Sequence, residues 1–119
     1  MGKDIFLKRV YDTPSTNDGF RVLVDRVWPR GLTKEKAKVD LWLKDIAPSS
    51  ALRKWFAHDI NKWPAFVEKY QAELKLNKSA VNTISQIASK QKCTLLFGAK
   101  DTEHNQAVVL LKFLQQLKI

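Results

Sequence analysis

The chain has 119 residues, with 21 lysines and arginines against 12 aspartates and glutamates, so its formal charge is +9. A chain of this length supports one hydrophobic core and is too short for two ordinary domains, so we expect a single domain over residues 1–119. Because 45% of the residues are hydrophobic and 10% are aromatic, a disordered or fibrous protein is excluded.

Histidine and cysteine content argues against a disulfide or a metal site. The single cysteine, Cys93, has no partner for an internal disulfide and cannot build a thiolate zinc site. His58 and His104 lack the spacing of a metal-binding pair on a helix, so we expect no metal and no cofactor. No apolar run approaches the roughly 18 residues of a membrane span, and the N-terminus lacks a secretory signal. These features predict a cytoplasmic protein that does not contact a membrane.

Two strands are predicted at the start of the chain, over residues 5–11 and 20–28, because both segments are rich in aromatic and β-branched residues. The loop between them is shorter than the dozen or so residues of a parallel crossover, which favours an antiparallel pair. The second strand is apolar on both faces at its middle. We therefore expect it to lie centrally in the sheet, covered on both sides.

Several helices are predicted next. Thr33 and Asp40 are candidate N-caps for two short helices, through residue 38 and over residues 41–46. A third helix follows Pro48-Ser49-Ser50, and a fourth begins near Pro64, which suits a first helical turn. Asn77 or Ser79 caps a fifth.

The chain ends with a predicted strand over residues 93–97 and a helix from about residue 102 to 117. This order predicts an α/β fold, with a small, at least partly parallel sheet of about three strands covered by helices on both faces. The long helical connection makes the second and third strands parallel. In such sheets the ligand crevice lies beyond the carboxyl ends of the strands, here at residues 26–31 and 98–105.

The end of the second strand carries several candidate site residues. Alternation along the strand would place Arg26 and Trp28 on one face and Asp25 on the other. Asp25 and Arg26 are then charges at the rim of an apolar strand, held either in structural ion pairs or against a ligand. Arg30 offers a planar fork for an anion, beside Gly31, which permits close backbone approach. The alternative for Arg30 is cation–π packing across Trp28.

The end of the third strand carries a second set. Gly98 permits close backbone approach, and Asp101 or Thr102 is a candidate cap of the last helix. His104 and Asn105 then fall in its first turn, where free N–H groups favour an anion and disfavour an imidazolium. A neutral His104 is a candidate acid or base, with a structural role as the alternative.

A third cluster, His58-Asp59, follows the helix that carries Arg53. His58 is a candidate for the same pocket, although a histidine at a helix end also suits the last carbonyls. No nucleophile is evident, since Ser49 and Ser50 have the positions of helix caps and Cys93 begins a strand remote from the crevice. We expect Cys93 to be an inert buried thiol.

Four blocks of the chain resemble the successive signatures of one family. They are RVLVDRVWPRG at 21–31, LWLKDIAPS at 41–49, LRKWF-x-HD at 52–59 and LLFGAKD-x-EHN at 95–105. In this order they resemble the YeaO-like branch of domain-of-unknown-function family 488. The resemblance implies a small bacterial α/β protein, and the family has no settled activity to carry over.

We weigh three functions. The first is binding of an anionic ligand, either a phosphorylated small molecule or a nucleotide or nucleic acid, which the charge of +9 favours. Its candidate residues are Arg26, Trp28, Arg30, Gly31, Lys44, Arg53, Gly98, Lys100 and Asn105. The second is an enzyme in which His104 or His58, with Asp25, Asp59 or Asp101, performs acid–base chemistry on an anionic substrate. The third is a structural or interaction protein, favoured if the strand-end arginines are sealed in ion pairs. Composition does not decide between these three functions, and it does not determine the oligomeric state.

Overall fold

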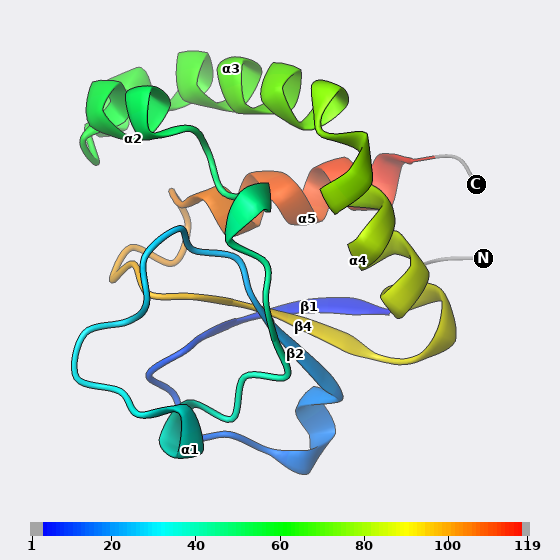
Figure 1. Ribbon diagram of the computed structural model, residues 1–119. Helices are drawn as coiled ribbons and strands as arrows, with labels where there is room; N and C mark the ends of the chain where they lie inside the picture. The colour runs from blue at the N-terminus through cyan, green and yellow to red at the C-terminus, as the bar shows by residue number, and fades with distance from the viewer. Residues whose placement is uncertain (1–3, 118–119) are drawn as a thin grey trace.

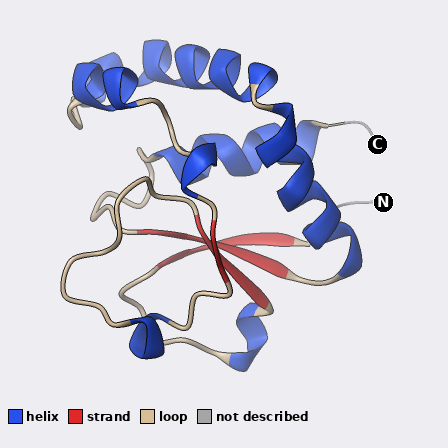
Figure 2. Ribbon diagram, viewed as in Figure 1, coloured by secondary structure: helices blue, strands red, loops and turns tan. Residues whose placement is uncertain are grey.

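A four-stranded parallel sheet forms the centre of the molecule (Figures 1 and 2) in a computed structural model that describes residues 4–117. The strands are β1 (Ile5–Arg9), β2 (Phe20–Leu23), β3 (Leu41–Trp42) and β4 (Cys93–Phe97), in the order β1-β4-β2-β3. All neighbouring pairs are parallel. The α/β class and the parallel pairing of β2 with β4 are therefore confirmed, and the sheet has four strands where about three were expected.

The helices surround this sheet unequally. They are α1 (Lys34–Ala37), α2 (Ser50–Phe56), α3 (Trp63–Leu76), α4 (Lys78–Lys90) and α5 (Gln106–Gln116), with 3-10 turns η1 (Thr16–Asp18), η2 (Lys44–Ile46) and η3 (Ile60–Lys62). Figure 1 shows α2 to α5 above the sheet and the short α1, with long loops, below it. Thr33 and Ser49 cap α1 and α2 as predicted, because their hydroxyls accept hydrogen bonds from the backbone N–H groups of Lys36 and Leu52.

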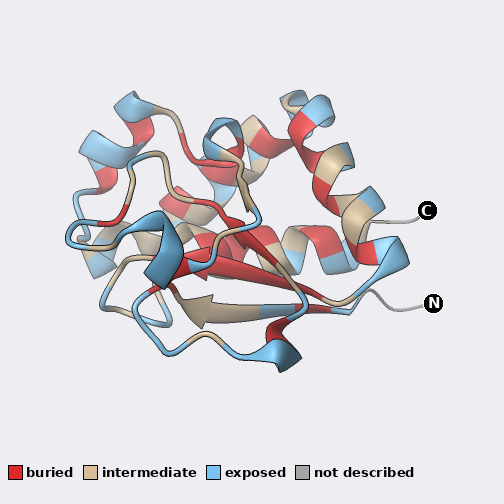
Figure 3. Ribbon diagram, turned by 60° about the horizontal axis from the view of Figure 1, so that its bottom comes forward, coloured by how far each residue is buried: buried red, intermediate tan, exposed pale blue. Residues whose placement is uncertain are grey.

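Side-chain alternation on the inner strands builds a core on each face of the sheet. Val22 and Leu95 point into the large cluster beneath the long helices, whereas Leu23 and Leu96 point into a smaller cluster with Ala37 of α1. All four leucine and valine side chains are fully buried. Figure 3 shows the inner strands buried and the edge strand β1 largely of intermediate burial. The expected central, doubly covered position of β2 is confirmed.

The antiparallel pairing favoured for the first two strands is wrong. Ile5 and Phe20 both pair with Cys93, so β4 lies between β1 and β2. A loop-length rule for neighbouring strands does not apply to strands that another strand separates. The connection re-enters the sheet at Gly19, whose φ is +67° and where a Cβ would lie 2.4 Å from the carbonyl oxygen of Lys92. Only glycine fits this close approach.

The helix predicted over residues 41–46 is wrong for its first half, and only Lys44–Ile46 forms a helical turn, the 3-10 turn η2. Residues 41 and 42 form β3, and the backbone N–H groups of Asp40 and Leu43 donate to the carbonyls of Arg21 and Leu23. Asp40 caps no helix, since its carboxylate accepts from the backbone N–H of Arg21. A short apolar segment fits both the helical period and the strand period, and pairing with β2 makes this one a strand.

Two element boundaries differ from the predictions in ways that affect the strand ends. β2 ends at Leu23, so alternation does not extend to Trp28, which packs in the smaller cluster with Leu23. The last helix begins at Gln106, and Asn105 is its N-cap, with Oδ1 accepting from the Val108 N–H. Residues before the cap form a bend and not a first turn. None of the helices described between residues 4 and 117 is long and apolar enough to cross a membrane.

Candidate functional site

A cavity of about 860 Å³ lies beyond the carboxyl ends of β2 and β4. We call it the strand-end cavity. Its walls come from residues 25–30 after β2, residues 98–99 and 104–106 after β4, and α2 with the turn that follows it. In Figure 1 the loops after β2 and β4 lie at the same end of the sheet, on the side of α2. Parallel strands end at one edge, which is why segments about 70 residues apart in the sequence meet here.

Most of the predicted site residues line this cavity. Those that do are Asp25, Arg26, Trp28, Arg30, Arg53, His58, Gly98, His104 and Asn105. Those that do not are Gly31, Lys44, Asp59, Lys100 and Asp101. Two lining residues were not predicted from the sequence: Tyr11, just beyond β1, and Lys54 of α2. A parallel assignment of β1 would have found Tyr11, because its strand ends at the same edge.

Asp25 is the one acidic residue in the described lining of the cavity. Its Oδ2 accepts from the backbone N–H of Gly98 at 2.8 Å, and its Oδ1 accepts from the side-chain amide of Gln106. Burial raises the pKa of the Asp25 carboxyl, and the hydrogen bonds from Gly98 and Gln106 and the charge of Arg53 oppose that rise. Asp25 therefore ties the two strand ends together.

Arg26 ties the end of β2 to the start of α2. Its Nε and Nη2 donate to the carbonyl oxygens of Pro48 and Ala47, each at 3.1 Å. A guanidinium has further N–H donors, and Nη1 hydrogen-bonds to no other residue that the structure describes. Arg26 is thus held in place by neutral carbonyls, and it forms no ion pair with a carboxylate between residues 4 and 117.

Arg30, Arg53 and Lys54 add three more permanent charges to the walls. All three residues are exposed, and none forms an ion pair with a carboxylate between residues 4 and 117. The Tyr11 hydroxyl donates to the backbone carbonyl of Arg30 at 2.8 Å and so fixes that loop. Trp28 does not stack with Arg30. It packs edge-on against Trp42, at 5.4 Å between ring centroids.

His104 reaches the cavity from a bend organised by Asp101. The Asp101 carboxylate accepts from the backbone N–H groups of Glu103 and His104, at 2.9 and 3.0 Å, and these bonds lower its pKa. Nδ1 of His104 lies 3.0 Å from Asp101 Oδ2. A carboxylate beside Nδ1 favours a proton on that nitrogen and fixes the orientation of the ring, so Nε2 is the ring nitrogen without a hydrogen-bond partner among the described residues. Trp63 meets this ring perpendicularly, at 5.1 Å.

His58 enters the cavity from a strained turn after α2. Ala57 and His58 both have left-handed backbone conformations, with φ of +47° and +59°. Such angles cost a non-glycine residue free energy, and they cluster at functional sites. Asp59 does not line the cavity. Its carboxylate accepts from the backbone N–H of Asn61 and caps η3.

Other candidates have structural surroundings. Lys44 lies over the ring of Trp42, at 5.2 Å. Cys93 is buried at the opposite end of β4, where burial raises the pKa of its thiol to about 11. The Asn105 side chain makes two structural hydrogen bonds: Oδ1 accepts from the Val108 N–H and caps α5, and Nδ2 donates to the carbonyl of Asp101. Within residues 4–117 no group of three or more His, Cys, Asp or Glu side chains is arranged to hold a metal ion.

The fold and the site define a small parallel α/β protein with a basic cavity at the carboxyl edge of its sheet. Residues 4–118 match the family DUF488-N3i, described as the inactive DUF488-N3 subclade. The chain belongs to this family.

Relatives in two groups of bacteria support the assignment. The chain is 44% identical to the uncharacterized protein YeaO of Escherichia coli over 114 residues, which cover 96% of this chain and 99% of that protein. It is 35% identical to the uncharacterized proteins Rv3073c of Mycobacterium tuberculosis and Mb3100c of Mycobacterium bovis over 106 residues, 89% of each chain. No solved structure matches the chain. The resemblance to the YeaO-like branch is confirmed.

Proposed function

We propose that the strand-end cavity binds a small organic anion. The observation that carries this proposal is the charge of its walls: Arg26, Arg30, Arg53 and Lys54 face one carboxylate, that of Asp25. No described ion pair joins Asp25 to any of these four residues, and its single negative charge can offset only one of their positive charges. Arginine forks suit phosphate and carboxylate groups, with which they form bidentate hydrogen bonds.

The size and lining of the cavity favour a phosphorylated metabolite or a nucleotide over a bare phosphate ion. Its volume of about 860 Å³ falls in the range of pockets that hold organic ligands. Trp28, Phe56 and Phe66 add aromatic surface beside the cations. A ligand with one anionic end and one flat apolar end would use both kinds of wall. The description of the family as inactive supports binding in preference to catalysis.

Titration calorimetry with adenosine monophosphate and with inorganic phosphate tests the proposal. We expect the nucleotide to bind and Arg53→Gln to weaken its binding by at least about tenfold, since a charge-assisted hydrogen bond contributes roughly 1.5–3 kcal/mol. Lys36→Gln is the matched control, because it removes the same charge from α1, outside the cavity.

Two results would contradict this proposal. In one, neither anion binds the wild-type protein. In the other, Lys36→Gln weakens binding as much as Arg53→Gln, which would indicate attraction by overall charge. A parallel titration with single-stranded RNA at several salt concentrations addresses nucleic acid. A steep loss of affinity with salt, shared by both variants, would assign RNA to the general basic surface.

Acid–base catalysis is a second candidate function, favoured by the contact between Asp101 and His104. A carboxylate on Nδ1 orients the ring and leaves Nε2 to exchange a proton with a substrate. If a screen for phosphatase, nuclease and nucleotidase activity finds turnover, His104→Gln should lower kcat about 100-fold or more. His58→Gln is the comparison variant. Turnover unchanged by His104→Gln would remove His104 from the chemistry.

A further inference from the structure

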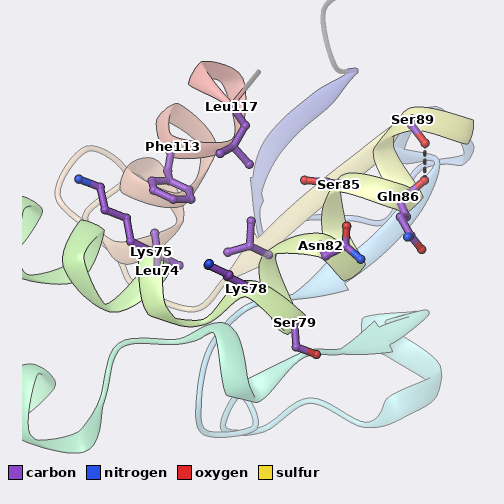
Figure 4. A pocket seen from close by; sticks show the side chains of 11 residues that line it. Leu74, Lys75, Lys78, Ser79, Asn82, Ser85, Gln86, Ser89, Phe113 and Leu117 are labelled. Carbon is purple, nitrogen blue, oxygen red and sulfur yellow. Dashed lines mark hydrogen bonds between the residues drawn. The ribbon is translucent and has the colours of Figure 1, made fainter. Parts of the chain in front are cut away.

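A second hollow, of about 880 Å³, lies on the helical side of the molecule (Figure 4). Its lining comes from the end of α3, from α4 and from the end of α5, and it shares no residue with the strand-end cavity. We call it the α4 groove. Leu74, Val81, Phe113 and Leu117 supply its apolar side chains. Figure 4 shows Phe113 and Leu117 reaching into it from α5, opposite α4.

The charges around the α4 groove have one sign. Lys75 and Lys78 line the end where α3 passes into α4, and no aspartate or glutamate belongs to the described lining. The other lining residues of α4 are small or uncharged: Ser79, Asn82, Ser85, Gln86 and Ser89. No charged residue occurs in α4 between Lys78 and Lys90. This wall is polar and uncharged, so it adds no charge of opposite sign to that of the two lysines.

An exposed apolar side chain lies near the groove in the sequence. Leu76, in the last turn of α3 between Lys75 and Asn77, is 87% exposed. A single exposed leucine is ordinary, and Leu76 does not itself line the groove, so the proposal rests on the lining residues. The pattern of apolar floor, short neutral wall and lysine rim is complementary to a helix with an apolar stripe flanked by carboxylates.

We propose that the α4 groove docks an acidic amphipathic helix of a partner protein. A helix lays an apolar stripe into a groove of this kind through residues spaced i, i+3 or i+4 and i+7. Its flanking glutamates or aspartates would meet Lys75 and Lys78. A second copy of this chain is a poor occupant, because each copy carries a charge of +9 and the same two lysines. The site is independent of the proposed anion-binding function.

The test uses the full chain and a fluorescently labelled 16-residue peptide with leucines on one face and glutamates beside them. Fluorescence anisotropy should detect binding, and the Lys75→Glu/Lys78→Glu double variant should lower the affinity at least tenfold. Ser79→Glu should also weaken binding severalfold. This variant places a carboxylate on the groove and in the first turn of α4, where it favours the helix, so it should fold normally.

The matched control is the Lys34→Glu/Lys36→Glu double variant, which makes the same change of net charge on α1, on the other side of the sheet. It should bind the peptide within about twofold of the wild type. Three results would overturn the proposal: no binding at about 1 mM peptide, equal loss in the control variant, or equal binding of a peptide with lysines in place of the glutamates. Chemical-shift changes confined to the α4 groove would support it.

Discussion

Asp18→Ala is expected to lower the free energy of unfolding by about 3–5 kcal/mol, because it leaves a buried arginine without its carboxylate. Arg21 is 4% exposed and Asp18 is 8% exposed, and Arg21 Nη1 lies 2.6 Å from Asp18 Oδ2. Lys8 Nζ lies 3.1 Å from Oδ1, and the Ser15 backbone N–H donates to Oδ2 at 2.9 Å. This network fastens the β1–β2 connection beneath the sheet.

Chemical denaturation, read by circular dichroism, measures this loss. Asp12→Ala is the control, since Asp12 is exposed in the same connection, and it should change stability by less than about 0.5 kcal/mol. Asp18→Asn keeps one acceptor oxygen and should lose less than Asp18→Ala. Equal stability of Asp18→Ala and the wild type would show that the ion pairs contribute nothing.

The same carboxylate predicts a pH dependence. Burial raises the pKa of Asp18, but hydrogen bonds from Ser15, Lys8 and Arg21 outweigh burial and bring the pKa below the ordinary value of 3.8. A lowered folded-state pKa contributes stability above the unfolded value, and that contribution is lost as the pH falls through the folded-state pKa. The stability difference between wild type and Asp18→Asn should therefore narrow below about pH 4.

Phe66→Ala is expected to cost about 3–5 kcal/mol of stability, the range for emptying a buried aromatic site. Phe66 is 2% exposed in α3 and stacks on Phe56 at 4.3 Å and on Trp63 at 5.6 Å between ring centroids. These rings hold α2 against α3. Phe56 and Phe66 also line the strand-end cavity, so the variant should weaken nucleotide binding as well as the fold.

Thermal and urea unfolding give the stability of Phe66→Ala. Ile60→Ala removes an apolar side chain that is 57% exposed, and it should stay within about 0.5 kcal/mol of the wild type. Phe66→Leu fills most of the site and should recover part of the lost stability. A loss below about 1 kcal/mol for Phe66→Ala would mean that neighbouring rings collapse into the space.

Local sequence patterns predicted the elements that depend on their own residues. The β4 strand over Cys93–Phe97, the start of α3 with Pro64 in its first turn and the caps at Thr33 and Ser49 all follow from the residues within a few positions of each. The start of α5 differs from the prediction, because Asp101 and Asn105 are both residue types that cap helices. Asp101 closes a bend with its carboxylate, and Asn105 then caps the helix.

The two predicted strand ends, with Arg26, Arg30 and His104, do meet in one cavity, because strands joined by long helical crossovers end at a common edge. The sequence did not show which strands β1 and β3 pair with. The parallel pairing of β1 with β4 brings Tyr11 to the cavity, and Lys44, which follows β3, lies outside its lining. The sequence also did not show that the Asp18 carboxylate pairs with Arg21, or that the Asp25 carboxylate accepts hydrogen bonds from Gly98 and Gln106. By itself the sequence determined the class of fold, the charge and the family. Strand order and charge pairing were decided by the tertiary structure, because both depend on contacts between residues far apart along the chain.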